Sequence, residues 1–421
     1  MEYLSESRRS DKTLPNEPLI ISMKDIMQMH RQNEMDAAEC RAVTASSDRG
    51  ESYFADDGRP GEDKVNPQLA MYKEILYRDR KTAGFMMPYP HGLVISQGER
   101  NSYYRGENQI FSKSQPSLYR SLDKFTSQED KELYRFIANM RIAEFRIFLC
   151  RLEIVQYWLD CYGSVLFEPL AQHYGLETEW LDITSDFDVA LFFATCKWKD
   201  GKWSPLDEKD IRKHPMGVIF HIPQWKAQYS MLLSGSEVSG MENEVILNNA
   251  ILPIGYQPLM RCHSQYAYGI HMEVPFPLQD DLEFEKLHFY HSVELSQKVF
   301  DMMDGGRKIY PQEGQEEFMD TIEKIKHATC FSEEAFEYVF NDKNTTKLSK
   351  DEIIEQLKCR QVLGVPVEIT GNQHPFKVTR AQIRRWNKEH AGFSIQKTYR
   401  INLHYRDVRY PSVSTKSEEI S

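Results

Sequence analysis

The middle third of the chain alternates short apolar runs with longer helical patterns, and this order restricts the possible folds more than any other feature. Four runs have the length and the flanking turn residues of β-strands, namely Gly92–Ser96, Ser102–Arg105, Trp180–Thr184 and Gly217–Ile222. Apolar residues at helical spacing separate the second run from the third. The sequence therefore predicts a mixed fold in which a β-sheet is wrapped by helices.

Capping residues predict where several helices begin and end. Ser127 can cap a long helix that we expect to continue to Trp158, and Ser185 or Asp186 can cap another that runs through Ala194. Gly175 can take the left-handed position after a helix that ends at 172–174. Beyond Pro311 we expect helices over 315–327, 332–340 and one opened by a capping box of Ser349 and Glu352. Before it we expect two further strands, a short one over 245–247 and one over 263–272.

Charge and composition exclude several classes of protein. A formal net charge of −11 argues against a chain that binds polyanions over its whole surface. No apolar run approaches the roughly 18–20 residues that span a bilayer, and the seven cysteines are scattered without a C-x-x-C pair, so we expect a cytoplasmic protein with no membrane segment. Phosphate-loop motifs and metal-spaced Cys/His pairs are absent from the sequence, so no metal is expected.

The sequence divides into four parts. We expect an N-terminal helical, partly disordered extension over 1–90, a central domain over 91–314, a helical and β extension over 315–410, and a disordered tail over 411–421. Basic residues gather between Lys377 and Arg409, around a predicted helix from Thr379 to His390 and a strand near 395–405. This stretch is either a contact for a nucleic acid or acidic partner, or a solvated face that pairs with the acidic remainder.

Three sequence blocks resemble the FRG domain of bacterial and phage proteins. The first is Tyr104-Arg105-Gly106 within residues 103–120, and the second is 170–176 with 180–184 and 189–194. The third is Arg261-Cys-His-Ser-Gln265, which is similar to the Arg-x-x-x-Gln segment of the family. The blocks keep the family's order from about Asn101 to about Pro311, although residues 177–184 depart from its usual Pro-Thr-Arg-Leu-Leu-Asp-Trp-Thr.

The first two blocks also resemble, more distantly, ADP-ribosyltransferases of the Arg-Ser-Glu type. That resemblance implies a small, mostly antiparallel split sheet (an α+β fold) and NAD or a related nucleotide as substrate. It implies that Arg105 braces the phosphates and that Asp182 or Thr184 lines the ribose. The glutamate of that family falls on Gln265, a departure for which Glu273 is a possible substitute. The site implied by the resemblance is catalytic Arg105, Asp182 and Gln265, with nucleotide contacts from Tyr104, Gly106, His173 and Thr184.

Each of these residues also has a purely structural interpretation. Arg105 can be an ion-pair residue, His173 a helix-terminal or core histidine, and Thr184 a helix N-cap. The leading hypothesis is an intracellular ADP-ribosyltransferase-like effector, plausibly in toxin or phage-defence biology. The alternatives are a non-catalytic nucleotide- or nucleic-acid-binding module and a structural adaptor. In an enzyme Arg105, Asp182 and Gln265 should converge on one cleft, whereas in an adaptor they should scatter.

Overall fold

The structure is a computed structural model of the chain. It describes residues 18–46, 86–89, 92–95, 102–152, 155–156, 159, 165–199, 201–223, 250–255, 257–281, 284–310, 316–343, 346–371, 374–376 and 378–385. The predicted strand near 245–247 and the one over 395–405 lie outside these residues.

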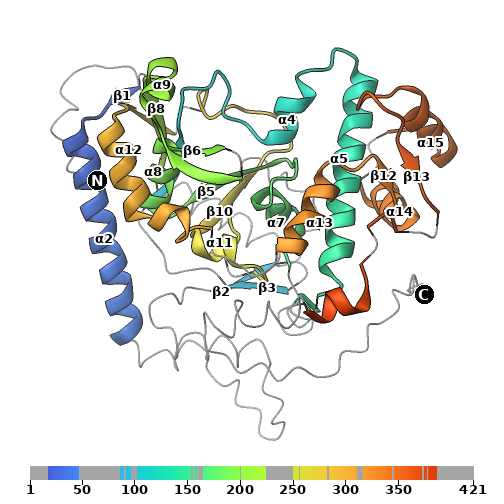
Figure 1. The fold of residues 1–421 in the computed structure, drawn as a ribbon, viewed down its shortest axis with the longest axis horizontal. Helices are drawn as coiled ribbons and strands as arrows, with labels where there is room; N and C mark the ends of the chain where they lie inside the picture. Colours follow the sequence, from blue (N-terminus) through green and yellow to red (C-terminus); the bar gives the residue numbers. More distant parts are fainter. Residues whose placement is uncertain are drawn as a thin grey trace, which may run out of the picture.

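A seven-stranded sheet forms the centre of the molecule (Figure 1). Every neighbouring pair in it is antiparallel except β1 with β11, as expected for a mostly antiparallel sheet. In spatial order the strands are β1 (Leu19–Ile20), β11 (Glu285–Tyr290), β8 (Met216–Pro223), β4 (Ser102–Glu107), β5 (Trp180–Thr184), β10 (Ala267–His271) and β9 (Ala250–Pro253).

The sheet separates between its two middle strands. β4 pairs with β8 from Ser102 to Glu107, but it pairs with β5 only where Tyr104 lies opposite Thr184. Backbone groups of Arg105 and Asp182 are therefore not joined by the ladder, and side chains can enter between the strands. The side chains of the adjacent tyrosines lie on opposite faces of β4. Tyr103 is buried in one core cluster and Tyr104 packs against another.

Helix α8 (Phe187–Thr195) lies directly on β4 because Gly106 has no side chain. A Cβ atom at Gly106 would be 1.7 Å from the carbonyl oxygen of Ala190, closer than any packed contact. Asp186 caps the helix by accepting hydrogen bonds from the backbone N–H groups of Asp188 and Val189 at 2.9 and 3.1 Å. Of the two caps that the sequence allowed, Asp186 is the one the structure uses.

Helix α7 (Phe167–His173) covers the other half of the same face and joins a core with α5 and α11. It ends as predicted, with Gly175 at a φ of 83°. The predicted strand over 263–272 is wrong in its first part, because Met260–Ser264 forms helix α11 and only Ala267–His271 is strand β10.

The long helix α5 (Gln128–Leu149) is capped by Ser127, whose side chain accepts from the Asp130 N–H. Its predicted continuation to Trp158 is wrong, because α5 ends at Leu149 in a tighter turn in which the N–H of Leu152 bonds the Leu149 carbonyl. One face of α5 packs against the C-terminal helices, which lie beside it in Figure 1.

The predicted helices beyond Pro311 are confirmed as α13 (Glu316–Lys326), α14 (Glu333–Asp342) and α15 (Lys350–Cys359), the last with the Ser349–Glu352 capping box. Two short strands, β12 (Cys330–Phe331) and β13 (Glu368–Ile369), pair beside them. Of the basic stretch between Lys377 and Arg409, the described part is a helical turn from Arg380 to Arg385, which Thr379 caps through the Gln382 N–H.

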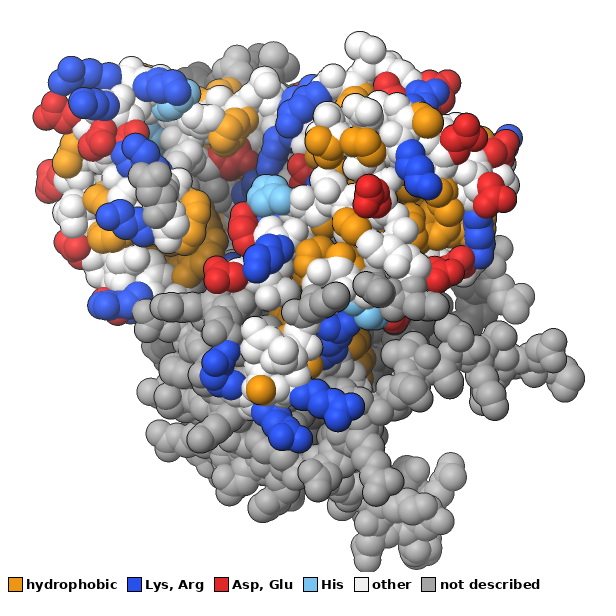
Figure 2. Space-filling view, turned by 45° about the vertical axis from the view of Figure 1, so that its right-hand side comes forward, with side chains coloured by type: hydrophobic (Ala, Val, Ile, Leu, Met, Phe, Trp, Pro, Cys, Tyr) orange, Lys and Arg blue, Asp and Glu red, His pale blue; other side chains and the backbone are white. Residues whose placement is uncertain are grey.

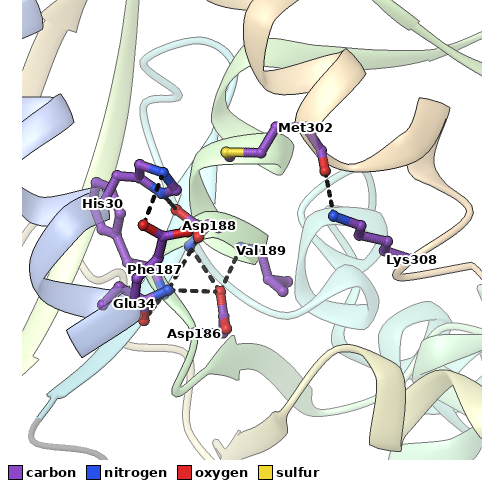
Figure 3. A network of polar contacts seen from close by, with 9 residues as sticks. His30, Glu34, Asp186, Phe187, Asp188, Val189, Met302 and Lys308 are labelled. Atoms are coloured by element: carbon purple, nitrogen blue, oxygen red, sulfur yellow. Dashed lines mark hydrogen bonds and ion pairs between the residues drawn. The ribbon is translucent and has the colours of Figure 1, made fainter. Parts of the chain in front are cut away.

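The N-terminal helix α2 (Met23–Ser46) packs against α8 and is joined to it by side-chain hydrogen bonds (Figure 3). The remaining elements are α4 (Ser117–Leu122), β6 (Cys196–Lys199), β7 (Lys202–Pro205), α9 (Glu208–Lys213), α12 (Val293–Met302), the 3-10 turn η2 (Asp304–Gly306), and the hairpin of β2 (Met86–Tyr89) and β3 (Gly92–Ile95). Within the described part of the chain, no helix combines the length and the apolar character needed to span a bilayer.

Candidate functional site

A cleft of about 270 Å³ opens at the point where β4 and β5 separate. The two strands form its floor, the end of α7 and the first turns of α8 form opposite walls, and Gln265 and Tyr310 complete the lining. All seven residues of the predicted site line this single cleft, namely Tyr104, Arg105, Gly106, His173, Asp182, Thr184 and Gln265. They come from three elements (β4, α7 and β5) and a loop, and lie up to 161 residues apart in the sequence.

Arg105 is held at the separation of the strands by two hydrogen bonds. Its Nη1 donates to the backbone carbonyl of Asp182 at 2.7 Å, and its Nε donates to Glu107 Oε1 at 2.9 Å. Glu107 is itself buried and accepts a bond from Ser114 Oγ. Arg105 therefore closes the gap between β4 and β5, so its structural interpretation is correct in part. The guanidinium still lines the cleft, 19% exposed, with Nη2 bonded to none of the described residues.

His173, Gln265 and Asp182 form a chain of polar side chains in one wall. Gln265 Oε1 lies 3.0 Å from His173 Nδ1, and Gln265 Nε2 donates to the Ile309 carbonyl at 3.1 Å. The other imidazole nitrogen, Nε2, lies 3.6 Å from Asp182 Oδ1. Neither of those two atoms has a hydrogen-bond partner among the described residues, although both are buried. Both ends of the Gln265 amide are thus bonded inside the protein, whereas the His173–Asp182 pair is incomplete.

Thr184 is not the helix cap that its position suggested as an alternative. Its hydroxyl donates to the Gln265 backbone carbonyl at 2.7 Å and accepts from the Asp186 N–H at 3.0 Å. The hydroxyl thereby ties the end of β5 to the segment that carries Gln265. This fixes the third motif block against the second, and so sets the width of the cleft.

Two contributors to the site lie outside the predicted set. Tyr310 lines the cleft, and Arg261 places its guanidinium 4.9 Å from the centre of that ring and 4.3 Å from the ring of Tyr174. Arg261 also donates to the His173 carbonyl at 3.0 Å, which anchors the end of α7. Burial raises the pKa of Tyr310, so its hydroxyl stays protonated at neutral pH. The Arg-x-x-x-Gln block contained Arg261, whereas Tyr310 lies outside the three sequence blocks.

The possible substitute for the missing glutamate, Glu273, does not line the cleft. β10 begins beside the Gln265 end of the cleft and runs away from it, so Glu273, two residues beyond the end of the strand, is exposed on the far side. Asp182 is the carboxylate that the cleft contains.

Lys, Arg, Asp and Glu side chains are interspersed over the described surface in Figure 2, without a wide area of one sign. That distribution agrees with the overall acidic balance of the sequence. On the small described area at the lower edge of this view, Lys and Arg side chains gather without acidic ones among them.

Residues 100–202 match the family model of the FRG domain. The match contains the Tyr104-Arg105-Gly106 block and the block that ends in α8, and it confirms the resemblance for both. It is shorter than the 91–314 expected for the domain, and Gln265 and Tyr310 lie beyond it. Neither a curated protein nor a solved structure is significantly similar to the chain.

Proposed function

We propose that the cleft binds NAD or a related nucleotide and that the protein transfers an ADP-ribosyl group to a macromolecule. The observation that carries this proposal is the convergence of all seven predicted residues on one cleft between separated strands. A structural adaptor would have no need to bring a cation, a carboxylate and an incompletely bonded histidine to the same opening.

The size of the cleft agrees with one end of a dinucleotide. Pockets that enclose a whole drug-sized molecule usually exceed about 300 Å³, whereas this one measures about 270 Å³. The nicotinamide and its ribose would occupy the cleft, and the adenine half would extend past Arg105. The remaining donors of the Arg105 guanidinium suit a pyrophosphate there, because a planar fork binds phosphate oxygens in pairs.

Cleavage of the bond between nicotinamide and ribose requires negative charge beside the sugar. When the bond between C1′ of the ribose and the nicotinamide nitrogen breaks, the bonding electrons leave with nicotinamide and the ribose becomes cationic. Asp182 supplies a carboxylate within the cleft, where a preorganised charge stabilises such a transition state. The nucleophile of the acceptor then bonds to C1′ and loses its proton. Gln265 carries no charge and is bonded at both ends of its amide to His173 and Ile309, so this proposal assigns the carboxylate role to Asp182.

Calorimetric titration of the full chain with NAD, ADP-ribose and ATP tests binding, and release of nicotinamide from NAD tests turnover. We expect NAD to bind and nicotinamide to be released in the presence of a cell lysate. Binding without release would favour the non-catalytic nucleotide-binding module. No heat change with any of the three ligands would favour the structural adaptor.

A matched pair of arginine variants separates ligand binding from support of the fold. Arg105→Lys keeps the charge but loses the fork, so the NAD dissociation constant should rise at least about tenfold. Arg141 is the control, because it too donates from its guanidinium to a backbone carbonyl, that of Ala328, away from the cleft. Arg141→Lys should lose similar stability and leave NAD affinity within about twofold. Equal affinities in both variants would contradict a role for Arg105 in binding.

A further inference from the structure

The side-chain amide of Gln265 has one possible orientation. Its partner on one side is the Ile309 carbonyl, at 3.1 Å, which can only accept a hydrogen bond. The NH₂ group of Gln265 must therefore face Ile309, and the amide oxygen must face His173 Nδ1 at 3.0 Å. Gln265 is buried, so these two partners within the protein set the orientation of its amide.

This orientation fixes the proton of His173. Because the Gln265 oxygen can only accept, Nδ1 of the imidazole must carry a hydrogen and donate it. In the neutral ring the second nitrogen, Nε2, is then bare. The imidazole cannot rotate to exchange its two nitrogens, because the His173 side chain is only 2% exposed and stands at the end of α7.

The bare nitrogen faces a carboxylate. Nε2 lies 3.6 Å from Asp182 Oδ1, too far for a hydrogen bond, and neither atom has another partner. Two buried acceptors that face one another are unfavourable until a proton is placed between them. The pair is therefore arranged to receive a proton at Nε2, and the carboxylate would then stabilise the imidazolium.

We propose that His173 and Asp182 are the proton-accepting pair of this cleft and that Gln265 is a positioning residue that keeps Nε2 as the accepting atom. This inference rests on the proposed function for its reaction step alone. In that step the O–H or N–H of the acceptor attacks C1′ and its proton passes to His173 Nε2, while nicotinamide leaves with the electrons of the broken bond. Every atom and charge is then accounted for without a further reactant.

Other charged groups face this pair from the surrounding elements. Arg105 and its partner Glu107 lie on β4, and Arg261 donates to the His173 carbonyl from α11. Lys326 of α13 lies near Gly175, and Tyr310 stays neutral because burial raises its pKa. None of these groups differs between the wild-type chain and the variants below, so a change in the titration of His173 reports on Gln265.

The test is nitrogen-15 spectroscopy of the full chain with labelled histidine, which distinguishes a protonated ring nitrogen from a bare one. For neutral His173 we expect the proton on Nδ1. Gln265→Glu places a carboxylate beside Nδ1, which favours the imidazolium, so His173 should remain protonated to a pH at least about one unit higher. His291, a buried histidine that bonds the Asn108 carbonyl outside the cleft, provides the internal reference.

Gln257 supplies the matched control variant. It is also a buried glutamine with both ends used, accepting from the Leu166 N–H and donating to the Ile254 carbonyl. Gln257→Glu should leave the titration of His173 unchanged. A proton found on Nε2 of the neutral ring, or equal titrations in Gln265→Glu and Gln257→Glu, would overturn the proposal.

The two proposals fail in different ways. If the proton lies on Nδ1 and NAD is not cleaved, the positioning role of Gln265 stands and the proposed reaction is wrong. If NAD is cleaved, Gln265→Glu should move the acidic limb of the pH–rate profile upward by the same amount as the spectroscopic titration. If NAD is cleaved and the pH–rate profile of Gln265→Glu is the same as that of the wild type, the proton-accepting role of His173 is overturned.

Discussion

Two clusters in this protein join a histidine to an aspartate, and they differ in how fully their polar atoms are bonded. Between α2 and α8, His30 Nδ1 lies 2.7 Å from Asp188 Oδ1, and Asn33 donates to both Asp186 and Asp188. Asn33 also accepts from the Phe187 N–H. Figure 3 shows His30 turned toward Asp188. In the cleft, His173 and Asp182 are 3.6 Å apart and each has an unbonded atom.

The difference separates a cluster that holds the fold from one that is suited to a ligand. A buried polar group without a partner costs about 1–3 kcal/mol, so a fold retains one where something else compensates. The α2–α8 cluster satisfies its groups from within the chain. The cleft pair leaves two facing atoms unbonded to any described residue, beside a cleft that a ligand can enter. Both clusters adjoin α8, so they can be disturbed together or separately.

The largest effect should come from Gly106→Ala, which disturbs both clusters at once. The new methyl group would lie 1.7 Å from the Ala190 carbonyl oxygen and would push α8 away from β4. We expect a loss of at least about 3 kcal/mol in the free energy of unfolding, measured by chemical denaturation. Gly201→Ala, where a Cβ has open space, should cost only about 1–2 kcal/mol for its positive φ. Equal losses would show that α8 does not depend on Gly106.

Asn33→Ala should break the α2–α8 cluster alone. It removes the donor to Asp186 and Asp188 and the acceptor for the Phe187 N–H, in a side chain that is 8% exposed. The expected cost is about 2–3 kcal/mol in the free energy of unfolding, with NAD affinity of the folded protein unchanged. The control on the same helix is Gln32→Ala, which loses one exposed bond to Asp36. A large loss of affinity in Asn33→Ala would mean that the two clusters are coupled.

The ionisation of Asp188 should give the α2–α8 cluster a pH signature. Burial, and then the charge of Asp186, raises the pKa of Asp188 from 3.8 to about 6. Because the folded-state pKa is raised, this contribution to stability is complete below about pH 4 and is lost as pH rises through about 6. Asp188→Asn removes the titration, so between pH 4.5 and 7 the variant should gain about 1–3 kcal/mol relative to the wild type. A constant difference across that range would contradict the raised pKa.

The smallest change in stability is expected in the cleft. Asp182→Asn keeps the backbone carbonyl that binds Arg105 and offers an amide donor toward His173 Nε2. The free energy of unfolding should stay within about 0.5 kcal/mol or rise, while NAD affinity should fall at least about tenfold with the loss of charge. The comparison between the two clusters fails if Asp182→Asn destabilises the protein as much as Asn33→Ala does.

The sequence by itself determined the local structure around the cleft. The strand over Trp180–Thr184, the caps at Ser127, Ser349 and Gly175, and the Tyr104-Arg105-Gly106 block all follow from nearest-neighbour chemistry, and the structure has each of them. Turn and cap preferences act over a few residues, so a single sequence reveals them. The length of α5 and the start of β10 were predicted less well, because tertiary packing sets where those elements end.

Only the tertiary structure decided what each candidate residue is bonded to. The resemblance placed Gln265 at the position of the substrate acceptor, yet its amide binds a carbonyl 44 residues away at Ile309 and the ring of His173. Tyr310 gave no signal of its own because its place beside Arg261 depends on the path of the chain between them. Hydrogen bonds and ring contacts between distant segments form only after the sheet has assembled, so the sequence could name the residues of the cleft but not their roles.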